Sequence, residues 1–105
     1  MKMTTSNTHI VRIYISGPVP VIEQICRQDC MENPMCVTVD PTKFIYTGGE
    51  ETGAVIGLLN YPRFPSSKEA INARARSLAI KLLEGTHQRN ALIVSSETTE
   101  LVSQF

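Results

Sequence analysis

The chain has 105 residues, of which 42% are hydrophobic and 19% charged, so it predicts one folded domain and excludes a disordered segment. Ten basic and ten acidic side chains give a net charge of +0, which argues against DNA binding because that needs excess Lys and Arg. The sequence also has no run long enough to span a membrane and no secretion signal, and its odd number of cysteines, 3, favours a reducing, cytoplasmic location.

The N-terminal part of the chain predicts a flexible segment, a strand and a helix. Residues 1–8 are polar and are expected to be flexible, so the single domain should span residues 9–105. Residues 9–16 alternate apolar and polar side chains, which is the pattern of a half-buried strand. Pro20 suits the first turn of a helix, where its missing N–H costs nothing, and Pro34 follows the end of that helix.

Three strands are predicted in the middle of the chain. Residues 35–39 alternate until Pro41 interrupts them, residues 43–47 form a short strand, and residues 54–61 form a longer one. The glycine-rich residues 48–53 between the last two strands predict a hairpin loop.

A second helix and one or two strands complete the predicted fold. Ser66 and Glu69 have the spacing of a capping box, and Gly85 marks the end of the helix. Residues 91–94 are uniformly apolar and predict a fully buried strand, and residues 101–102 a short edge strand.

This order predicts an α+β fold: an antiparallel sheet with two helices on one face, in a ferredoxin-like split arrangement with an extra hairpin strand. The other face of the sheet would carry Arg12 and Tyr14 and would have no third layer of its own. Such a face favours a homo-oligomer, although a ligand or a partner protein could equally cover it.

The sequence contains no recognisable catalytic or metal-binding motif. Cys26 and Cys30 are four residues apart, but a structural zinc site needs four ligands, so no metal is predicted. Glu50 and Glu51 are adjacent on a predicted loop, which would not hold two carboxylates at a fixed separation for acid–base chemistry. We therefore predict no catalytic residues, no cofactor and no enzymatic activity.

The most informative stretch runs from Tyr46 to Pro65. Gly48 and Gly49 could expose backbone N–H groups to an anion, although glycines in such a position more often form a plain hairpin turn. Two prolines stiffen residues 60–65, which combine an amide, two aromatic rings and a guanidinium. Rings stack on bases and Arg binds phosphate, so this segment predicts a nucleotide site. In the alternative, the two rings only pack against the second helix and the guanidinium points to solvent.

The predicted ligand-binding residues fall in three groups: the stiffened segment, the open sheet face and the glycine pair. They are Asn60, Tyr61, Arg63 and Phe64, then Arg12 and Tyr14, then Gly48 and Gly49. In this hypothesis Tyr61 and Phe64 stack on a base, Arg63 holds phosphate, and Asn60 recognises a polar edge.

In residues 46–65, and again in residues 91–101 (ALIVSSETTEL), the chain resembles phage-encoded proteins of the Thoeris anti-defence family. The resemblance implies an oligomeric sponge in the host cytoplasm. Such a sponge sequesters a cyclic ADP-ribose-type messenger or a cyclic oligonucleotide without turnover. Two other hypotheses remain open at this point: a module that inhibits a host protein through the open sheet face, and a small enzyme that acts on the same ligand.

Overall fold

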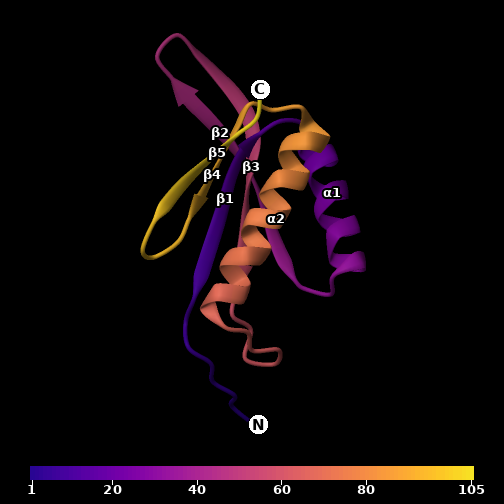
Figure 1. The fold of residues 1–105 in the computed structure, drawn as a ribbon, viewed down its shortest axis with the longest axis vertical. Coiled ribbons are helices and arrows are strands. Elements are labelled where there is room, and N and C mark those ends of the chain that lie inside the picture. The colour runs from indigo at the N-terminus through magenta and orange to yellow at the C-terminus, as the bar shows by residue number, and fades with distance from the viewer.

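The computed structural model describes residues 1–105 and shows two helices packed on one face of a five-stranded antiparallel sheet (Figure 1). The predicted fold class is therefore confirmed. The elements in chain order are β1 (Ile10–Ser16), α1 (Val19–Glu32), β2 (Val37–Tyr46), β3 (Gly49–Leu59), α2 (Lys68–Thr86), β4 (Asn90–Val94) and β5 (Thr99–Ser103).

The strand order is β2-β3-β1-β4-β5, so β1 lies at the centre of the sheet. Strands β1 to β4 follow the split arrangement predicted from the sequence. The two helices that connect them lie on the same face of the sheet. The extra strand is β5, which forms a hairpin with β4. This strand includes residues 101–102, for which the sequence predicted a short edge strand.

The core lies between the helices and the sheet face that they cover. Every second residue of β1 is fully buried there, beginning with Val11 and ending with Ile15. Helix α2 contributes the apolar stripe predicted from its spacing, including Leu78 and Leu82. Alternation along a strand and the 3.6-residue helical repeat together produce these two complementary faces. Neither helix is long and apolar enough to cross a membrane.

The ends of α2 differ from the sequence prediction by one or two residues. The N-cap is Ser67, whose hydroxyl accepts a hydrogen bond from the backbone N–H of Ala70 at 3.1 Å, in place of Ser66. Gly85 lies inside the helix, which ends at His87 in the left-handed conformation. A Cβ on Gly85 would lie 2.5 Å from the Ile25 side chain, so this glycine permits the close approach of α1 to α2.

The two short strands expected on either side of Pro41 form one continuous strand, β2. The prediction of two strands is wrong because β2 lies at the edge of the sheet, where a proline without an N–H is tolerated. The Thr52 carbonyl accepts a hydrogen bond from the Gly17 N–H, so the backbone polar groups of Thr52 point toward β1. Those of Ala54, two residues further along β3, point the same way. Ala54 pairs with Pro41, so the proline nitrogen faces away from the sheet.

The glycine-rich residues 48–53 are largely strand, so the predicted loop is also wrong. Strand β3 begins at Gly49, and only Thr47 and Gly48, the latter with φ of +89°, form the turn. The resulting β2–β3 hairpin extends past the end of the helices (Figure 1). Its outer part therefore has no helix packed on it.

The sheet face opposite the helices is uncovered, as expected, and carries Arg12 and Tyr14. A row of paired residues crosses it from Val55 through Tyr14 and Leu92 to Leu101. Leu92 is 40% exposed and Leu101 is 63% exposed. Strand β4 is therefore buried on one face only, whereas its uniform apolar sequence predicted complete burial. We call this surface the open sheet face.

Candidate functional site

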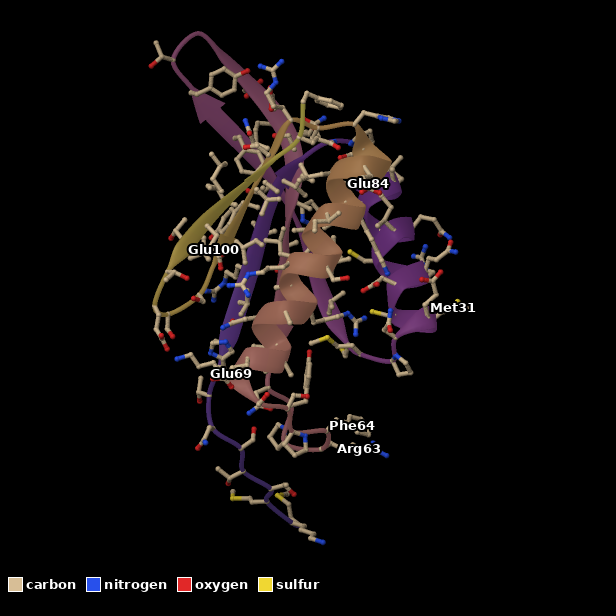
Figure 2. All side chains as sticks on the ribbon, viewed as in Figure 1. Met31, Arg63, Phe64, Glu69, Glu84 and Glu100 are labelled. Atoms are coloured by element: carbon tan, nitrogen blue, oxygen red, sulfur yellow. The ribbon has the colours of Figure 1, made fainter.

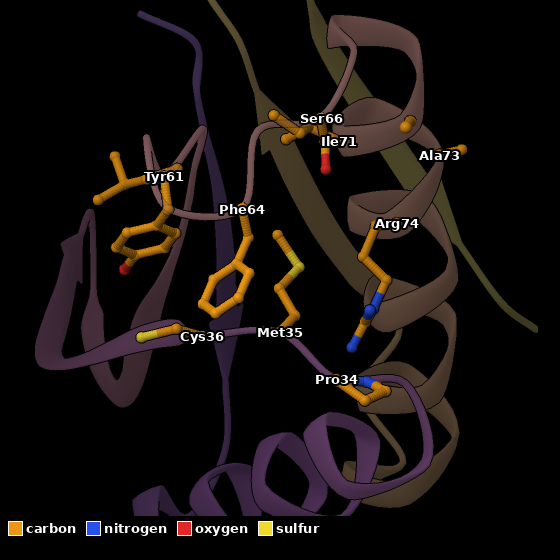
Figure 3. Close-up of a pocket in the computed structure, with 11 residues that line it drawn as sticks. Pro34, Met35, Cys36, Tyr61, Phe64, Ser66, Ile71, Ala73 and Arg74 are labelled. Atoms are coloured by element: carbon orange, nitrogen blue, oxygen red, sulfur yellow. The ribbon is translucent and has the colours of Figure 1, made fainter. Parts of the chain in front are cut away.

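A cavity of about 840 Å³ lies at the end of the sheet away from the hairpin, and we call it the loop pocket (Figure 3). Three segments enclose it: the α1–β2 connection, the loop after β3, and the first turns of α2. Its lining is mostly apolar and consists of Pro34, Met35, Cys36, Leu59, Tyr61, Phe64, Ser66, Ala70, Ile71, Ala73 and Arg74. The volume is within the range of small-molecule sites in proteins.

Arg74 supplies the only charged side chain of the loop pocket, and a buried carboxylate fixes its position. Its Nε and Nη2 donate to Asp29 Oδ2 at 3.0 and 2.8 Å, and Nη2 also donates to the Asn33 carbonyl at 2.7 Å. Asp29 is 2% exposed, and its Oδ1 accepts from Lys81 Nζ at 2.6 Å. Burial alone would raise the pKa of Asp29, but hydrogen bonds from Lys81 and Arg74 lower it overall. The carboxylate is therefore ionised and holds the guanidinium in one orientation.

The structure brings two of the four predicted residues of the stiffened segment into the loop pocket. The rings of Tyr61 and Phe64 both line it (Figure 3). The pKa of Tyr61 is raised, first by the neighbouring Cys36 thiol and then by burial. Phe64 remains 72% exposed, so its ring is not packed away against the helix.

The other two residues of that segment do not line the pocket. Arg63 lies at the outer end of the loop with its guanidinium 5.5 Å from the centre of the Phe64 ring (Figure 2). Asn60 stabilises the loop: its Nδ2 donates to the Asn7 carbonyl at 2.8 Å and its Oδ1 accepts from Ser66 N–H at 2.9 Å. A phosphate-holding role for Arg63 and a base-reading role for Asn60 stay predictions that this geometry does not favour.

A second group of candidate side chains lies on the outer part of the hairpin, and we call it the hairpin cluster. Phe44 pairs with Glu51 across β2 and β3, so both side chains lie on the open side of the sheet. Tyr46 is on the same side, and its hydroxyl donates to Glu51 Oε1 at 3.4 Å. The cluster therefore combines two aromatic rings with a carboxylate, without a cation between them.

The predicted glycine pair lies at the tip of this hairpin. Gly48 forms the turn, and a Cβ on Gly49 would lie 3.1 Å from the Tyr46 hydroxyl, so Gly49 lets the ring lie across the strand. Glu50 projects to the opposite face from Glu51, and its carboxylate is 3.9 Å from Lys43 Nζ. A role for the glycine N–H groups in ligand binding stays a prediction.

Two of the three cysteines have thiols that burial makes less acidic. Burial raises the pKa of Cys26 to about 12, so its thiol is protonated at neutral pH. Burial also raises the pKa of Cys30. No group of three His, Cys, Asp or Glu side chains is arranged to hold a metal ion.

Comparison with known proteins shows similarity in structure alone. The sequence matches no protein-family model. A search of curated proteins finds no match either. Among solved structures, the chain is similar to a phage SAM lyase in the apo state, with a TM-score of 0.77 and 15% identity, over 99% of this chain and 95% of that one. A phage SAM lyase in complex with S-methyl-5'-thioadenosine gives a TM-score of 0.76 and 14% identity over the same shares.

These matches establish a shared fold over the whole length of the chain, and they correct the functional prediction. The fold belongs to an enzyme in both matched structures, which contradicts our prediction of a non-catalytic nucleotide sponge or interaction module. One of those structures holds a small nucleoside, in keeping with the coarser expectation of a small-molecule ligand. Resemblance to the Thoeris anti-defence family itself stays a prediction, since neither matched structure is a Thoeris protein.

Proposed function

We propose that the protein is an enzyme that cleaves S-adenosylmethionine (SAM) as a lyase and releases S-methyl-5'-thioadenosine. The observation that carries this proposal is the match to phage SAM lyase, which covers 99% of this chain and leaves only 5% of the other chain unmatched. Since fold alone does not determine activity, the side chains must also suit the substrate. A cytoplasmic location, predicted from the free cysteines, would give the protein access to SAM.

The charge of SAM favours the hairpin cluster over the loop pocket as the reaction site. SAM carries a sulfonium and an ammonium group against one carboxylate, so its net charge is positive at neutral pH. Aromatic faces and carboxylates attract such a cation. Phe44, Tyr46 and Glu51 provide both kinds of group, whereas the loop pocket presents the cation of Arg74.

Lyase chemistry at this substrate breaks the bond between the sulfonium sulfur and the γ-carbon of the methionine part. The sulfur keeps both electrons of that bond and becomes the neutral thioether of S-methyl-5'-thioadenosine. The four-carbon fragment either loses a proton from its β-carbon and gains a double bond, or closes a ring when its carboxylate oxygen attacks the γ-carbon. In this proposal the Glu51 carboxylate accepts the proton or aligns the substrate ammonium, and Tyr46 holds the carboxylate in place.

Incubation of the purified protein with SAM tests the proposal directly. We expect SAM to disappear and S-methyl-5'-thioadenosine to appear in equal amounts, as measured by liquid chromatography with mass spectrometry. The second product should be one water lighter than homoserine, because a lyase adds no water oxygen. Formation of S-adenosylhomocysteine would indicate methyl transfer instead, and unchanged SAM would refute the proposal.

We propose further that copies of the chain associate through the open sheet face. Val55, Tyr14, Leu92 and Leu101 form an apolar row on this face that no element of the same chain covers. The hairpin cluster continues the same side of the sheet, since Glu51 and Val55 are four residues apart on β3. A second copy on this face would therefore shield the cluster from water and complete a pocket around it.

Replacement of Leu101 by Arg is expected to convert the oligomer into a monomer. The change puts a charge into the apolar row, and the fold should tolerate it because Leu101 is 63% exposed in the single chain. Native mass spectrometry at micromolar concentration would report the subunit number. Ile80→Arg is the matched control, since Ile80 is 48% exposed on α2, in the other layer. An unchanged subunit number in the Leu101 variant would contradict association through this face.

A further inference from the structure

We infer that the loop pocket is a second ligand site, separate from the hairpin cluster, for a small apolar molecule that carries one carboxylate or similar anionic group. The two sites lie at opposite ends of β3, whose 11 residues run from the hairpin turn to the loop after Leu59. At roughly 3.3 Å per strand residue they are about 30 Å apart, too far for one small molecule to reach both. The inference does not depend on SAM cleavage.

The anionic group is inferred from the way in which Arg74 is held. The Arg74 side chain is 18% exposed, and Asp29 and Asn33 bind its Nε and Nη2. Its Nη1 makes no hydrogen bond within the chain, and the side chain lines the loop pocket. A guanidinium that is already fixed loses little conformational freedom when it binds an anion, so the site is preorganised.

The apolar body of the ligand is inferred from the walls of the loop pocket. Met35 and the rings of Tyr61 and Phe64 come from two different connections and face the same cavity (Figure 3). Phe64 is 72% exposed, and a ligand that covered its ring would remove this apolar surface from water. Aromatic rings and a thioether both accommodate planar or flexible hydrocarbon groups.

The charge of the lining also excludes other ligand classes. One arginine cannot neutralise several phosphates, so a nucleotide di- or triphosphate does not fit this site. The same arginine repels the sulfonium and ammonium groups of SAM. A single anionic group on an apolar body matches both the charge and the volume of about 840 Å³.

A matched pair of probes tests the role of charge. Calorimetric titration of the intact protein with 4-phenylbutyrate and with its uncharged amide compares two molecules of almost equal shape. We expect the acid to bind at least about tenfold more tightly than the amide. A hydrogen bond to a charged group contributes more binding free energy than a neutral one, and the difference corresponds to an affinity ratio of this order. Equal affinities for acid and amide, or no binding of either, would overturn the inference.

A matched pair of variants tests the location. Ala73→Trp places a large side chain in the cavity from an exposed position of α2, and it should abolish binding of 4-phenylbutyrate. Ile80→Trp makes the same kind of change seven residues further along the helix, outside the pocket, and should leave binding unchanged. Binding that survives in Ala73→Trp would place the probe elsewhere, for example on the open sheet face, and would refute the site.

The two proposed sites can also be separated by activity. Saturation of the wild-type protein with 4-phenylbutyrate should leave the rate of SAM cleavage unchanged, because the loop pocket lies apart from the hairpin cluster. Competition between S-methyl-5'-thioadenosine and 4-phenylbutyrate would show that the loop pocket belongs to the reaction site, and would overturn the inference of a separate one. A protein without SAM cleavage but with tight binding of the acid would refute the lyase proposal alone.

Discussion

Replacement of Glu51 by Gln is expected to lower the rate of SAM cleavage by roughly 100-fold or more, the usual contribution of one acid–base group. Gln keeps the shape of the side chain and its hydrogen bond from the Tyr46 hydroxyl, but it removes the negative charge. The charge is the property that accepts a proton or attracts the cationic substrate. Steady-state kinetics with a product assay for S-methyl-5'-thioadenosine would measure the effect as a fall in kcat/KM.

Two further variants make this result interpretable. Glu84→Gln changes an exposed carboxylate on α2 that forms no ion pair, and it should retain wild-type activity (Figure 2). Tyr46→Phe keeps the ring and removes only the hydroxyl that orients Glu51, so a smaller loss, within about tenfold, is expected. Full turnover in Glu51→Gln would exclude the hairpin cluster as the reaction site.

Replacement of Arg74 by Met is expected to destabilise the fold by about 3 kcal/mol, the lower end for breaking a buried ion pair. The variant removes both guanidinium bonds to Asp29 Oδ2 and leaves this buried carboxylate with Lys81 as its only cationic partner. Chemical denaturation at neutral pH would measure the change. Arg76→Met is the control, because Arg76 pairs with Glu100 at the surface, where an ion pair contributes little.

The pH dependence of this destabilisation follows from the pKa of Asp29. The folded-state pKa lies below the ordinary value of 3.8, so the ion pair stabilises the protein fully above that value. The stabilisation is lost as the pH falls through the folded-state pKa. We therefore expect the difference between wild type and Arg74→Met to shrink below about pH 4. A difference that stayed constant down to pH 2 would show that the lost bonds do not involve an ionised Asp29.

The elements that the sequence predicts best are those whose local pattern agrees with their final environment. Strand β1 alternates and is buried on one face, and the apolar stripe of α2 covers that face. Strand β2 was mistaken for two strands because Pro41 normally interrupts a ladder, and only its position at the sheet edge makes it acceptable. A proline inside an apolar run indicates either an edge strand or a break between two strands, and the local pattern alone does not distinguish these two cases.

The candidate site was harder to predict because it depends on contacts between distant residues. Tyr61 and Phe64 were identified as binding residues from their own segment, and both reach a cavity. The sequence places Glu51 on a solvated loop, but its contact with Tyr46 depends on a hairpin whose second strand begins at Gly49 and not at the predicted residue 54. The pairing of Arg74 with Asp29 spans 45 residues, and no spacing rule reveals it.

Pro41 also restricts how copies of this protein can assemble. Its nitrogen faces outward from the middle of β2, where a strand from another molecule would need a backbone donor. Growth of one sheet into the next along this edge, the geometry of fibrils, is therefore interrupted at that position. Strand β5, the other edge of the sheet, contains no proline, so any pairing between the sheets of two copies is directed to that edge.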